Sequence, residues 1–373
     1  MTTAHEEITV SLGERSYPII VGYGLLDSFG AALTRVARGR RVGLVSDEVV
    51  WSYYGDRVVR SLDVVGFHVT RAIIPAGEEQ KTLATASSIV DTFLDARLDR
   101  LSTVVALGGG VVGDVAGFAS AILLRGVRIA HVPTTVIAQV DASIGGKTGV
   151  NHRRGKNLIG AFHQPSLVAI DVGTLATLPR GELAAGLAEV VKHAVIRDPA
   201  LFEHLEGELG RYAAFEATPE AWVRLMAANC RIKAEVVRLD ERETHLRAIL
   251  NYGHTAGHAI EVLGDYARYR HGEATLFGMR VAGALATRRG MWSADDERRQ
   301  NALIDQLLLV QPPTDFTVDA VWDAMRSDKK AREGALRFVL PTGIGNAVVA
   351  GDVSREEFAT AWARAIVPAT VRA

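Results

Sequence analysis

The stretch Leu101-Ser-Thr-Val-Val-Ala-Leu-Gly-Gly-Gly110-Val-Val-Gly-Asp-Val115 decides the fold of this chain. Its apolar run at 103–107 predicts a buried strand, the glycines at 108–110 predict a turn, and a helical pattern begins at Val111. The first N–H groups of a helix lack intrahelical partners and lie at the positive end of the helix dipole. A strand, a glycine turn and a helix start therefore predict a site for an anion such as phosphate.

The glycines of this turn also fit a dinucleotide-binding pattern. Gly108, Gly110 and Gly113 satisfy the G-x-G-x-x-G spacing between a predicted strand and a predicted helix. A tight turn that needs positive φ angles is an equally good interpretation of the spacing alone. No acidic residue follows about 20 positions later, so an ordinary Rossmann dehydrogenase fits poorly. Hydroxyl, ammonium and amide groups set among downstream glycines favour a phosphate-bearing ligand: Thr134, Thr135, Lys147, Lys156 and Asn157.

Strands and helices alternate over the first half of the chain, as a mostly parallel sheet requires. Strands are predicted at 8–12, 17–21, 41–47, 67–73, 103–107 and 127–132. From 180 to about 309 nearly every segment has helical periodicity, and a short β-like stretch precedes a final helix. We therefore expect an α/β, Rossmann-like domain over residues 1–177 and a mostly α-helical domain over residues 178–373.

A polar stripe marks a predicted helix at 243–263. Its members are spaced 4, 4, 3 and 4 apart and fall within about 80° of the helix surface: Glu243, Arg247, Asn251, His254 and His258. A solvated face with i,i+4 pairs is the alternative. Gly253 and Gly257 would each cost about 1 kcal/mol inside a helix, so their presence predicts the close approach of another group. His254 and His258 form H-x-x-x-H, a spacing at which both imidazoles can bind one metal.

Composition excludes several classes of protein. The 373 residues are 48% hydrophobic and 23% charged, with a formal net charge of −1, which favours neither nucleic acid nor an anionic membrane as partner. The single cysteine, Cys230, excludes an internal disulfide and cysteine-based zinc sites. The N-terminal sequence lacks the features of a signal peptide, and no apolar run approaches a membrane span. We expect a cytoplasmic protein that acts on a small molecule.

Long motifs resemble those of the 3-dehydroquinate synthase family of sugar-phosphate cyclases. They are GGGVVGDVAGFASAILLRG, VPTTVIAQVDASIGGKTGVN and GKNLIGAFHQP, followed by LPRGELAAGLAEVVKHAVI, LRAILNYGHTAGHAIE, RHGEA and DKK. The resemblance extends over nearly the whole chain. It implies conversion of 3-deoxy-D-arabino-heptulosonate 7-phosphate to 3-dehydroquinate and phosphate by transient oxidation with NAD, phosphate elimination, re-reduction and intramolecular aldol closure. It also implies one divalent ion, Zn2+ or Co2+, and a homodimer.

The resemblance also implies roles for individual residues. It assigns the metal to Glu189, His254 and His271 and turns His258 to the substrate, whereas spacing alone would make both His254 and His258 ligands. Residues implied to contact substrate are Arg125 (across a dimer interface), Asp141, Lys147, Asn157, Lys192, Lys233, Glu243, Arg247, Asn251, His258 and Lys330, the last preferred over Lys329. Residues implied to hold NAD are Asp47, Gly77, Glu78, Lys81, Gly109, Gly110, Gly113, Asp114, Thr134, Thr135, Lys147, Lys156, Thr174 and Thr177.

Simpler interpretations exist for several of these residues. Asp47 precedes a predicted helix and suits an N-cap, and the loop at 75–82 suits a capped turn. Glu189 and Lys192 could be ordinary surface residues, and His271 could cap a helix.

Three functions remain open besides the one that the resemblance implies. One is a cyclase for another sugar phosphate: an amino-dehydroquinate, sedoheptulose 7-phosphate or glucose 6-phosphate cyclase. Another is a metal- and NAD-dependent alcohol or glycerol dehydrogenase, which releases NADH, and the last is a non-catalytic nucleotide-binding module. The dehydroquinate substrate carries a carboxylate that neutral sugar phosphates lack, and Arg247 and Lys233 are the cations expected to hold it.

Overall fold

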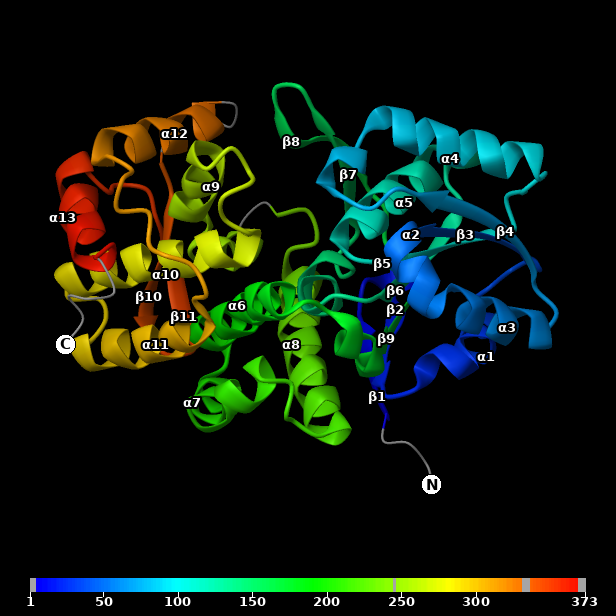
Figure 1. Ribbon diagram of the computed structural model, residues 1–373, viewed down its shortest axis with the longest axis horizontal. Coiled ribbons are helices and arrows are strands. Elements are labelled where there is room, and N and C mark those ends of the chain that lie inside the picture. Colours follow the sequence, from blue (N-terminus) through cyan, green and yellow to red (C-terminus); the bar gives the residue numbers. More distant parts are fainter. Residues whose placement is uncertain (1–4, 244–245, 331–335, 368–373) are drawn as a thin grey trace. The chain divides into compact units, whose positions relative to one another are not determined.

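The contacts divide the chain into two compact units, shown in Figure 1. The computed structural model describes residues 5–243, 246–330 and 336–367, without the side chains of 328–330. One unit comprises Met1–Leu178 and Thr218–Arg242, and the other comprises Pro179–Ala217 and Glu243–Ala373. The first break, at 178, lies next to the predicted domain boundary, but residues 218–242 belong with the N-terminal unit and not with the helical domain in which the sequence placed them.

The N-terminal unit is built on a seven-stranded sheet. Its strands are β1 His5–Val10, β2 Tyr17–Gly22, β3 Arg41–Asp47, β4 His68–Ile74, β5 Thr103–Gly108, β6 Arg128–Pro133 and β9 Leu167–Asp171. Their order across the sheet is β1-β2-β9-β6-β5-β3-β4, and every pair is parallel except β1 with β2. The predicted opening hairpin and mostly parallel sheet are confirmed.

Helices cover both faces of this sheet because its strands are apolar on both sides. Along β5, Val104 and Ala106 pack against α4 (Leu83–Asp95) and α5 (Gly110–Ile122), whereas Val105 and Leu107 join the core beneath α1 (Phe29–Thr34) and α3 (Asp56–Val64). Figure 1 shows the two helix pairs on opposite sides of the strands. The continuous apolar run that predicted a buried strand is therefore explained by burial on both faces.

The strand order reverses direction between β3 and β5. From β3 the chain continues outward to β4, while β5, β6 and β9 follow one another in the other direction. Ligands of open α/β sheets bind beyond the carboxyl ends of the strands at such a point. Here those ends carry Asp47, the last residue of β3, and the glycine turn at 108–110, which begins at the last residue of β5.

Two further elements complete the N-terminal unit. The hairpin β7 (Lys147–His152) and β8 (Gly155–Phe162) packs on α5, where Gly117 leaves room for the side chain of Thr148. Lys147 and Lys156, which stand among glycines in the sequence, therefore lie on the strands of this hairpin. Helix α8 (Pro219–Leu239) begins at a Thr218 N-cap and packs against β1 and β2, and this contact assigns it to the N-terminal unit.

The helical unit is organised around one buried helix, α10 (His271–Arg288), which packs against four other helices of the unit: α6 (Arg180–Arg197), α9 (His254–Leu263), α11 (Ala294–Leu307) and α13 (Arg355–Ala365). The elements of this unit are α6 Arg180–Arg197, α7 Pro199–Ala213, η8 Leu246–Asn251, α9 His254–Leu263, α10, α11 Ala294–Leu307, α12 Val318–Lys330, β10 Phe338–Gly343, β11 Asn346–Ala350 and α13 Arg355–Ala365. The antiparallel hairpin β10–β11 is the β-like stretch predicted before the final helix.

The predicted helix at 243–263 is wrong as a single element. The structure has a 3-10 helix at Leu246–Asn251, a left-handed Gly253 with φ of 80°, and then α9. A Cβ on Gly253 would lie 2.6 Å from Met279 Cγ, and one on Gly257 would lie 3.1 Å from the Ala274 carbonyl oxygen. The close approach predicted from these glycines is confirmed: the approaching group is the backbone of α10, together with the side chain of Met279 at Gly253. Gly278 of α10 in turn abuts the Gly253 carbonyl.

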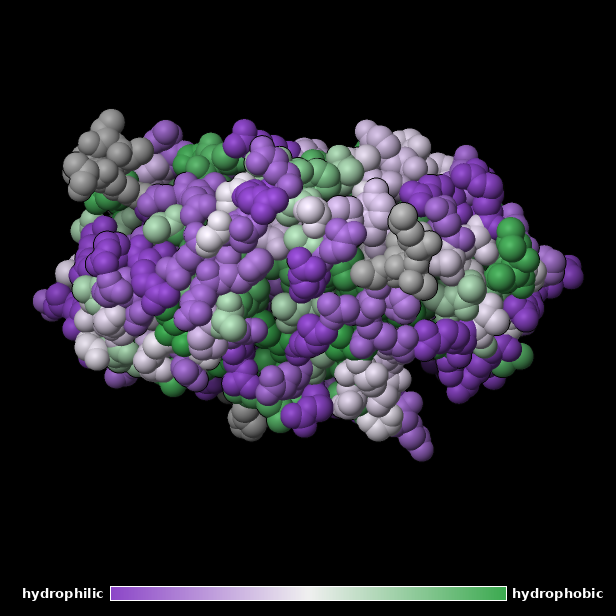
Figure 2. Space-filling model, turned by 90° about the horizontal axis from the view of Figure 1, so that it is seen from below, coloured by the Kyte–Doolittle hydropathy of each residue, from purple (hydrophilic) through white to green (hydrophobic). Residues whose placement is uncertain are grey.

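The surface carries mainly hydrophilic side chains on the face shown in Figure 2, with small hydrophobic groups between them. Among the described residues, no helix combines the length and the apolar composition needed to cross a membrane.

His131 on β6 predicts a specific dependence of stability on pH. Burial, with a smaller contribution from the charge of His163, lowers the pKa of His131 from 6.5 to about 4. Between these values the unfolded chain binds a proton that the folded chain does not, so stability falls as the pH drops below 6.5. We expect a loss of about 2 kcal/mol from this group between pH 7 and pH 5.

Urea unfolding at the two pH values measures this loss as the difference between the wild type and His131→Gln. The matched control is His68→Gln, which removes an exposed histidine of β4 and should behave as the wild type. An identical pH dependence in the wild type and His131→Gln would contradict the assignment.

Candidate functional site

The glycine turn after β5 presents the start of α5 without a side-chain cap. Gly109 is the N-cap residue, with φ of −74° and ψ of −169°, and in the described part of the chain the helix start has no side-chain cap hydrogen bond. None of the glycines at 108, 110 and 113 is among the positive-φ residues, so the tight-turn interpretation is wrong. Gly108 is instead required for close packing, because a Cβ there would lie 2.7 Å from Val112. The uncapped N–H groups suit a phosphate.

Contacts near this turn fix three of the predicted cofactor residues, Lys81, Asp114 and Glu78. Lys81 Nζ lies 2.5 Å from Asp114 Oδ2 on α5, and the lysine is buried. Glu78 accepts a hydrogen bond of 2.8 Å from Asn151 Nδ2 of the hairpin. Gly77 has φ of 126° and ψ of 156°, a conformation essentially confined to glycine. The loop at 75–82 therefore contacts both α5 and the hairpin. Thr82 is also the N-cap residue of α4, which confirms the interpretation of this loop as a capped turn.

Other predicted cofactor residues make local structural bonds. Asp47 accepts from Val50 N at 2.8 Å, which confirms the N-cap interpretation, and Thr135 Oγ1 accepts from Ala138 N at 3.2 Å. Thr174 donates to the Asp171 carbonyl, and Thr177 shares a bond of 2.7 Å with Tyr54. Thr134 differs, because its hydroxyl is buried and makes no hydrogen bond within the described chain. Contact with NAD remains a prediction for all of them.

The predicted substrate residues of the N-terminal unit fall into two groups. Lys147 and Asn157 lie exposed on the hairpin, Asn157 with φ of 57°, while Lys156 is half-buried there. Arg125 is exposed, with φ of 67°, at the end of a 3-10 turn (Leu123–Arg125). Lys233 of α8 forms an ion pair with Asp141, which joins two predicted substrate residues.

In the helical unit, Glu189 and Lys192 form a buried ion pair on α6. Each side chain is only 1% exposed, so the surface interpretation of this pair is wrong. Lys192 bonds Glu189 Oε2, which leaves Oε1 facing two imidazoles: His254 Nε2 at 3.8 Å and His271 Nε2 at 3.6 Å. The structure thus brings together the three residues predicted to bind the metal.

These three side chains fit a divalent ion. Glu189 Oε1 is buried without a hydrogen-bond partner among the described residues, and the imidazole distances are too long for N–H···O hydrogen bonds. Two ligands bound at about 2.1 Å to a tetrahedral ion lie about 3.4 Å apart, close to the separations seen. Two histidines and one carboxylate leave a fourth position open, as in catalytic zinc sites. His271 does not cap α10, because the N-cap residue is Arg270.

The two histidines differ in their pKa. Burial and the charge of Lys192 hold the pKa of His254 well below its usual value, which keeps the ring in the neutral form that binds metals. Burial also lowers the pKa of His271, but its bond to Glu261 and the charges of Glu261 and Glu189 outweigh burial and raise it.

His258 belongs to a second group. Its ring lies 5.4 Å from that of His254, as the H-x-x-x-H spacing predicts, but the metal-type clusters among the described residues do not pair these two histidines. One cluster is Glu189, His254 and His271, and the other is His258, Glu261 and His271. The sequence did not identify Glu261 as a site residue. The signal that could have found it is its position seven residues after His254, which places it on the same face of α9.

The remaining predicted substrate residues of this unit are placed as follows. Asn251 donates to Glu243 at 3.2 Å, so the two lie together even though the helix predicted to align them is broken. Arg247 is among the largest fully buried side chains, at 1% exposure. Lys329 and Lys330 end α12, and their side chains lie outside the described residues.

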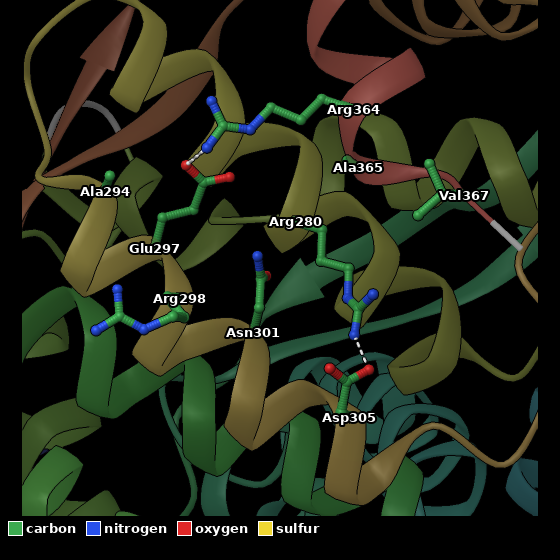
Figure 3. A pocket seen from close by; sticks show the side chains of 9 residues that line it. All are labelled: Arg280, Ala294, Glu297, Arg298, Asn301, Asp305, Arg364, Ala365 and Val367. Carbon is green, nitrogen blue, oxygen red and sulfur yellow. Dashed lines mark hydrogen bonds and ion pairs between the residues drawn. The ribbon is translucent and has the colours of Figure 1, made fainter. Parts of the chain in front are cut away.

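A separate pocket lies between α10, α11 and α13, and no predicted site residue lines it (Figure 3). Arg280 reaches across it to Asp305, and Arg364 lies 2.6 Å from Glu297. Both pairs join neighbouring helices, and we interpret them as structural.

An uncapped glycine turn on a doubly wound sheet and a Glu-His-His cluster on a helical unit define a class, the α/β nucleotide-binding proteins with a helical metal-binding unit. Family models described as the N-terminal and C-terminal parts of 3-dehydroquinate synthase match residues 71–185 and 186–331. The 3-dehydroquinate synthase of Synechococcus sp. (strain CC9605) is 49% identical over 357 residues, covering 95% of this chain and 96% of that protein. The chain belongs to the 3-dehydroquinate synthase family.

Solved structures of sugar-phosphate cyclase type share the fold. The 2-epi-5-epi-valiolone synthase ValA from Streptomyces hygroscopicus subsp. jinggangensis 5008, with NAD+ and Zn2+ bound, has a TM-score of 0.86 at 32% identity, covering 95% of this chain and 98% of that one. A 2-deoxy-scyllo-inosose synthase complexed with carbaglucose-6-phosphate, NAD+ and Co2+ also has a TM-score of 0.86, at 26% identity, covering 96% and 99%.

Replacing His271 tests the metal cluster. We expect His271→Ala to lose stoichiometric zinc, because only two of three protein ligands remain, whereas His258→Ala should retain it. Metal analysis after dialysis of the purified proteins measures both. Retention of zinc by His271→Ala together with its loss from His258→Ala would show that the ligands are those of the H-x-x-x-H spacing.

Proposed function

We propose that this chain is a 3-dehydroquinate synthase, which converts 3-deoxy-D-arabino-heptulosonate 7-phosphate to 3-dehydroquinate and phosphate. The observation that carries the proposal is the 49% identity to a named 3-dehydroquinate synthase over 95% of the chain. The two cyclases with other names are 32% and 26% identical. The uncapped helix start of the N-terminal unit suits a nucleotide, and the Glu189–His254–His271 cluster of the helical unit suits a metal. Cations such as Lys233 suit an anionic substrate.

NAD and one divalent ion, Zn2+ or Co2+, would supply reversible hydride transfer and Lewis acidity when bound. The side chains proposed to hold the ion are Glu189, His254 and His271. For NAD, the uncapped N–H groups of α5 and the Lys81–Asp114 pair at the sheet's reversal point support a pyrophosphate and ribose site. The residues proposed around it are Asp47, Gly77, Glu78, Lys81, Gly109, Gly110, Gly113, Asp114, Thr134, Thr135, Lys147, Lys156, Thr174 and Thr177.

The substrate phosphate requires fixed cations and amide donors. We assign this role to Lys147 and Asn157 of the hairpin, to Asn251 and His258, to Lys330, and to Arg125 from the partner copy of a proposed homodimer. Asp141, Lys192 and Glu243 would contact hydroxyl groups. The ion pairs Lys233–Asp141 and Lys192–Glu189 support this, because each holds a cation and a carboxylate in fixed relative positions. We expect the enzyme in the cytoplasm.

The substrate carboxylate separates this reaction from those of neutral sugar phosphates. Arg247 is proposed to bind it, with Lys233 as the second cation. A buried guanidinium, such as that of Arg247, binds a carboxylate through two parallel hydrogen bonds more strongly than an exposed one does, since less water competes.

Phosphate release measured together with absorbance at the NADH band tests the proposed function. We expect release of phosphate from the heptulosonate phosphate without net NADH accumulation, because the hydride returns to the product within each turnover. Accumulation of NADH would indicate a dehydrogenase, and absence of both signals a binding module. Efficient turnover of sedoheptulose 7-phosphate would indicate a different cyclase.

Arg247→Ala tests the carboxylate assignment. Losing one partner of a buried charge-assisted contact should reduce transition-state binding of the acid substrate by about 2 to 4 kcal/mol, measured as kcat/KM. Arg268→Ala, which removes an exposed arginine of the same unit paired with Asp315, is the control and should leave kcat/KM unchanged. Indifference of the acid substrate to Arg247→Ala would exclude this residue as the carboxylate partner.

A further inference from the structure

Glu261 is a buried carboxylate that the proposed reaction does not use. It lies on α9 with 5% of its surface exposed, and a carboxylate is rarely buried without a charge-compensating contact. Its Oε2 lies 3.0 Å from Nδ1 of His271, the first residue of α10. This contact joins a proposed metal ligand to a neighbouring helix.

The chemistry of the two groups fixes where the proton of His271 resides. An ionised carboxylate only accepts hydrogen bonds, so Nδ1 of His271 is the donor and carries the proton. In the neutral ring Nε2 then has a lone pair, and Nε2 is the nitrogen that lies 3.6 Å from Glu189 Oε1. His254 is held in the same way, since its Nδ1 lies 3.1 Å from the Tyr252 carbonyl oxygen and its Nε2 faces Glu189.

We propose that Glu261 is a positioning residue of the metal site: it keeps the His271 proton on Nδ1, orients Nε2 toward Glu189 and thereby sets the affinity for the ion without binding it. The inference rests on the proposed function, which requires an ion at Glu189, His254 and His271. Carboxylates bonded to the distal nitrogen of a metal-binding histidine fix its tautomer and increase the basicity of the ligand.

The geometry favours this role over direct ligation by Glu261. The alternative cluster of His258, Glu261 and His271 would use Nδ1 of His271, which faces Glu261 at hydrogen-bonding distance. The two nitrogens of one imidazole point in different directions, so His271 cannot direct both at one ion. The His271 ring is also closer to His254, at 5.0 Å, than to His258, at 5.9 Å. Because Nε2 of His271 faces Glu189, Glu261 accepts a hydrogen bond from Nδ1 and does not bind the ion.

Metal affinity of the full-length protein tests the proposal without using activity. The measurement is competition for Zn2+ against a chromophoric chelator, for the wild type, Glu261→Gln and Glu261→Ala. The visible absorption of bound Co2+ is recorded in parallel, because it reports the number and kind of ligands. Glu261→Gln keeps an oxygen that can accept from Nδ1 and removes the charge, whereas Glu261→Ala removes both.

We expect both variants to bind one ion with the Co2+ spectrum of the wild type. The affinity of Glu261→Ala should fall by about 10- to 100-fold and that of Glu261→Gln by less. Glu297→Gln is the matched control: it removes another buried carboxylate of this unit, paired with Arg364, and should retain wild-type affinity. Because Glu261→Gln is isosteric, it keeps the test valid if Glu261→Ala fails to fold.

Two results would overturn the proposal. Unchanged Zn2+ affinity in Glu261→Gln, and in Glu261→Ala where it folds, would show that the contact does not act on the ion. A changed Co2+ spectrum with loss of stoichiometric binding would make Glu261 a ligand. Failure of the wild type to bind Zn2+ would be a different result, since it would remove the metal from the proposed function itself.

Discussion

The buried carboxylate of Glu189 is the constraint on which the helical unit depends. An ionised group at 1% exposure is tolerated only where opposite charge and hydrogen-bond donors surround it. Lys192, one turn further along α6, compensates one oxygen, and the other faces imidazoles from α9 and α10. Three helices must therefore meet at one point, and the central position of α10 follows from that requirement as much as from its apolar side chains.

The N-terminal unit obeys a different constraint, because its site is made mainly by the backbone. Reversal of strand order between β3 and β5 leaves the start of α5 beyond the carboxyl ends of the strands, and the glycines at 108–110 add no side chains there. Side-chain contacts then hold the loop at 75–82 in place. Lys81 pairs with Asp114 of α5, and Glu78 accepts a hydrogen bond from Asn151 of the hairpin. Such a site depends on sheet topology, whereas the metal cluster depends on individual donor atoms.

The sequence predicted the sheet well because apolar runs bounded by glycine are distinctive, and β3 was predicted with its observed limits. It failed at 243–263, where helical spacing continues through Gly253 although the backbone turns left-handed there. Periodicity also cannot reveal which core a helix joins, so α8 was assigned to the wrong unit. Glu189 and His271 are far apart in sequence, and their association came from the family resemblance, not from spacing. Glu261 was missed because its partner lies on another helix.

The contact of α9 with α10 through Gly253, Gly257 and Gly278 has a consequence for how this protein can diverge. Backbone atoms approach each other closely at all three glycines, and the side chain of Met279 also lies against Gly253, so there is little free space between the two helices that carry His254 and His271. The separation of the two imidazoles therefore depends mainly on how closely the main chains of the two helices approach. Substrate-facing residues can change over generations while the spacing of the ligands stays constant. A fold whose metal ligands are held by closely packed helices is suited to acquiring new substrates while its metal site stays the same.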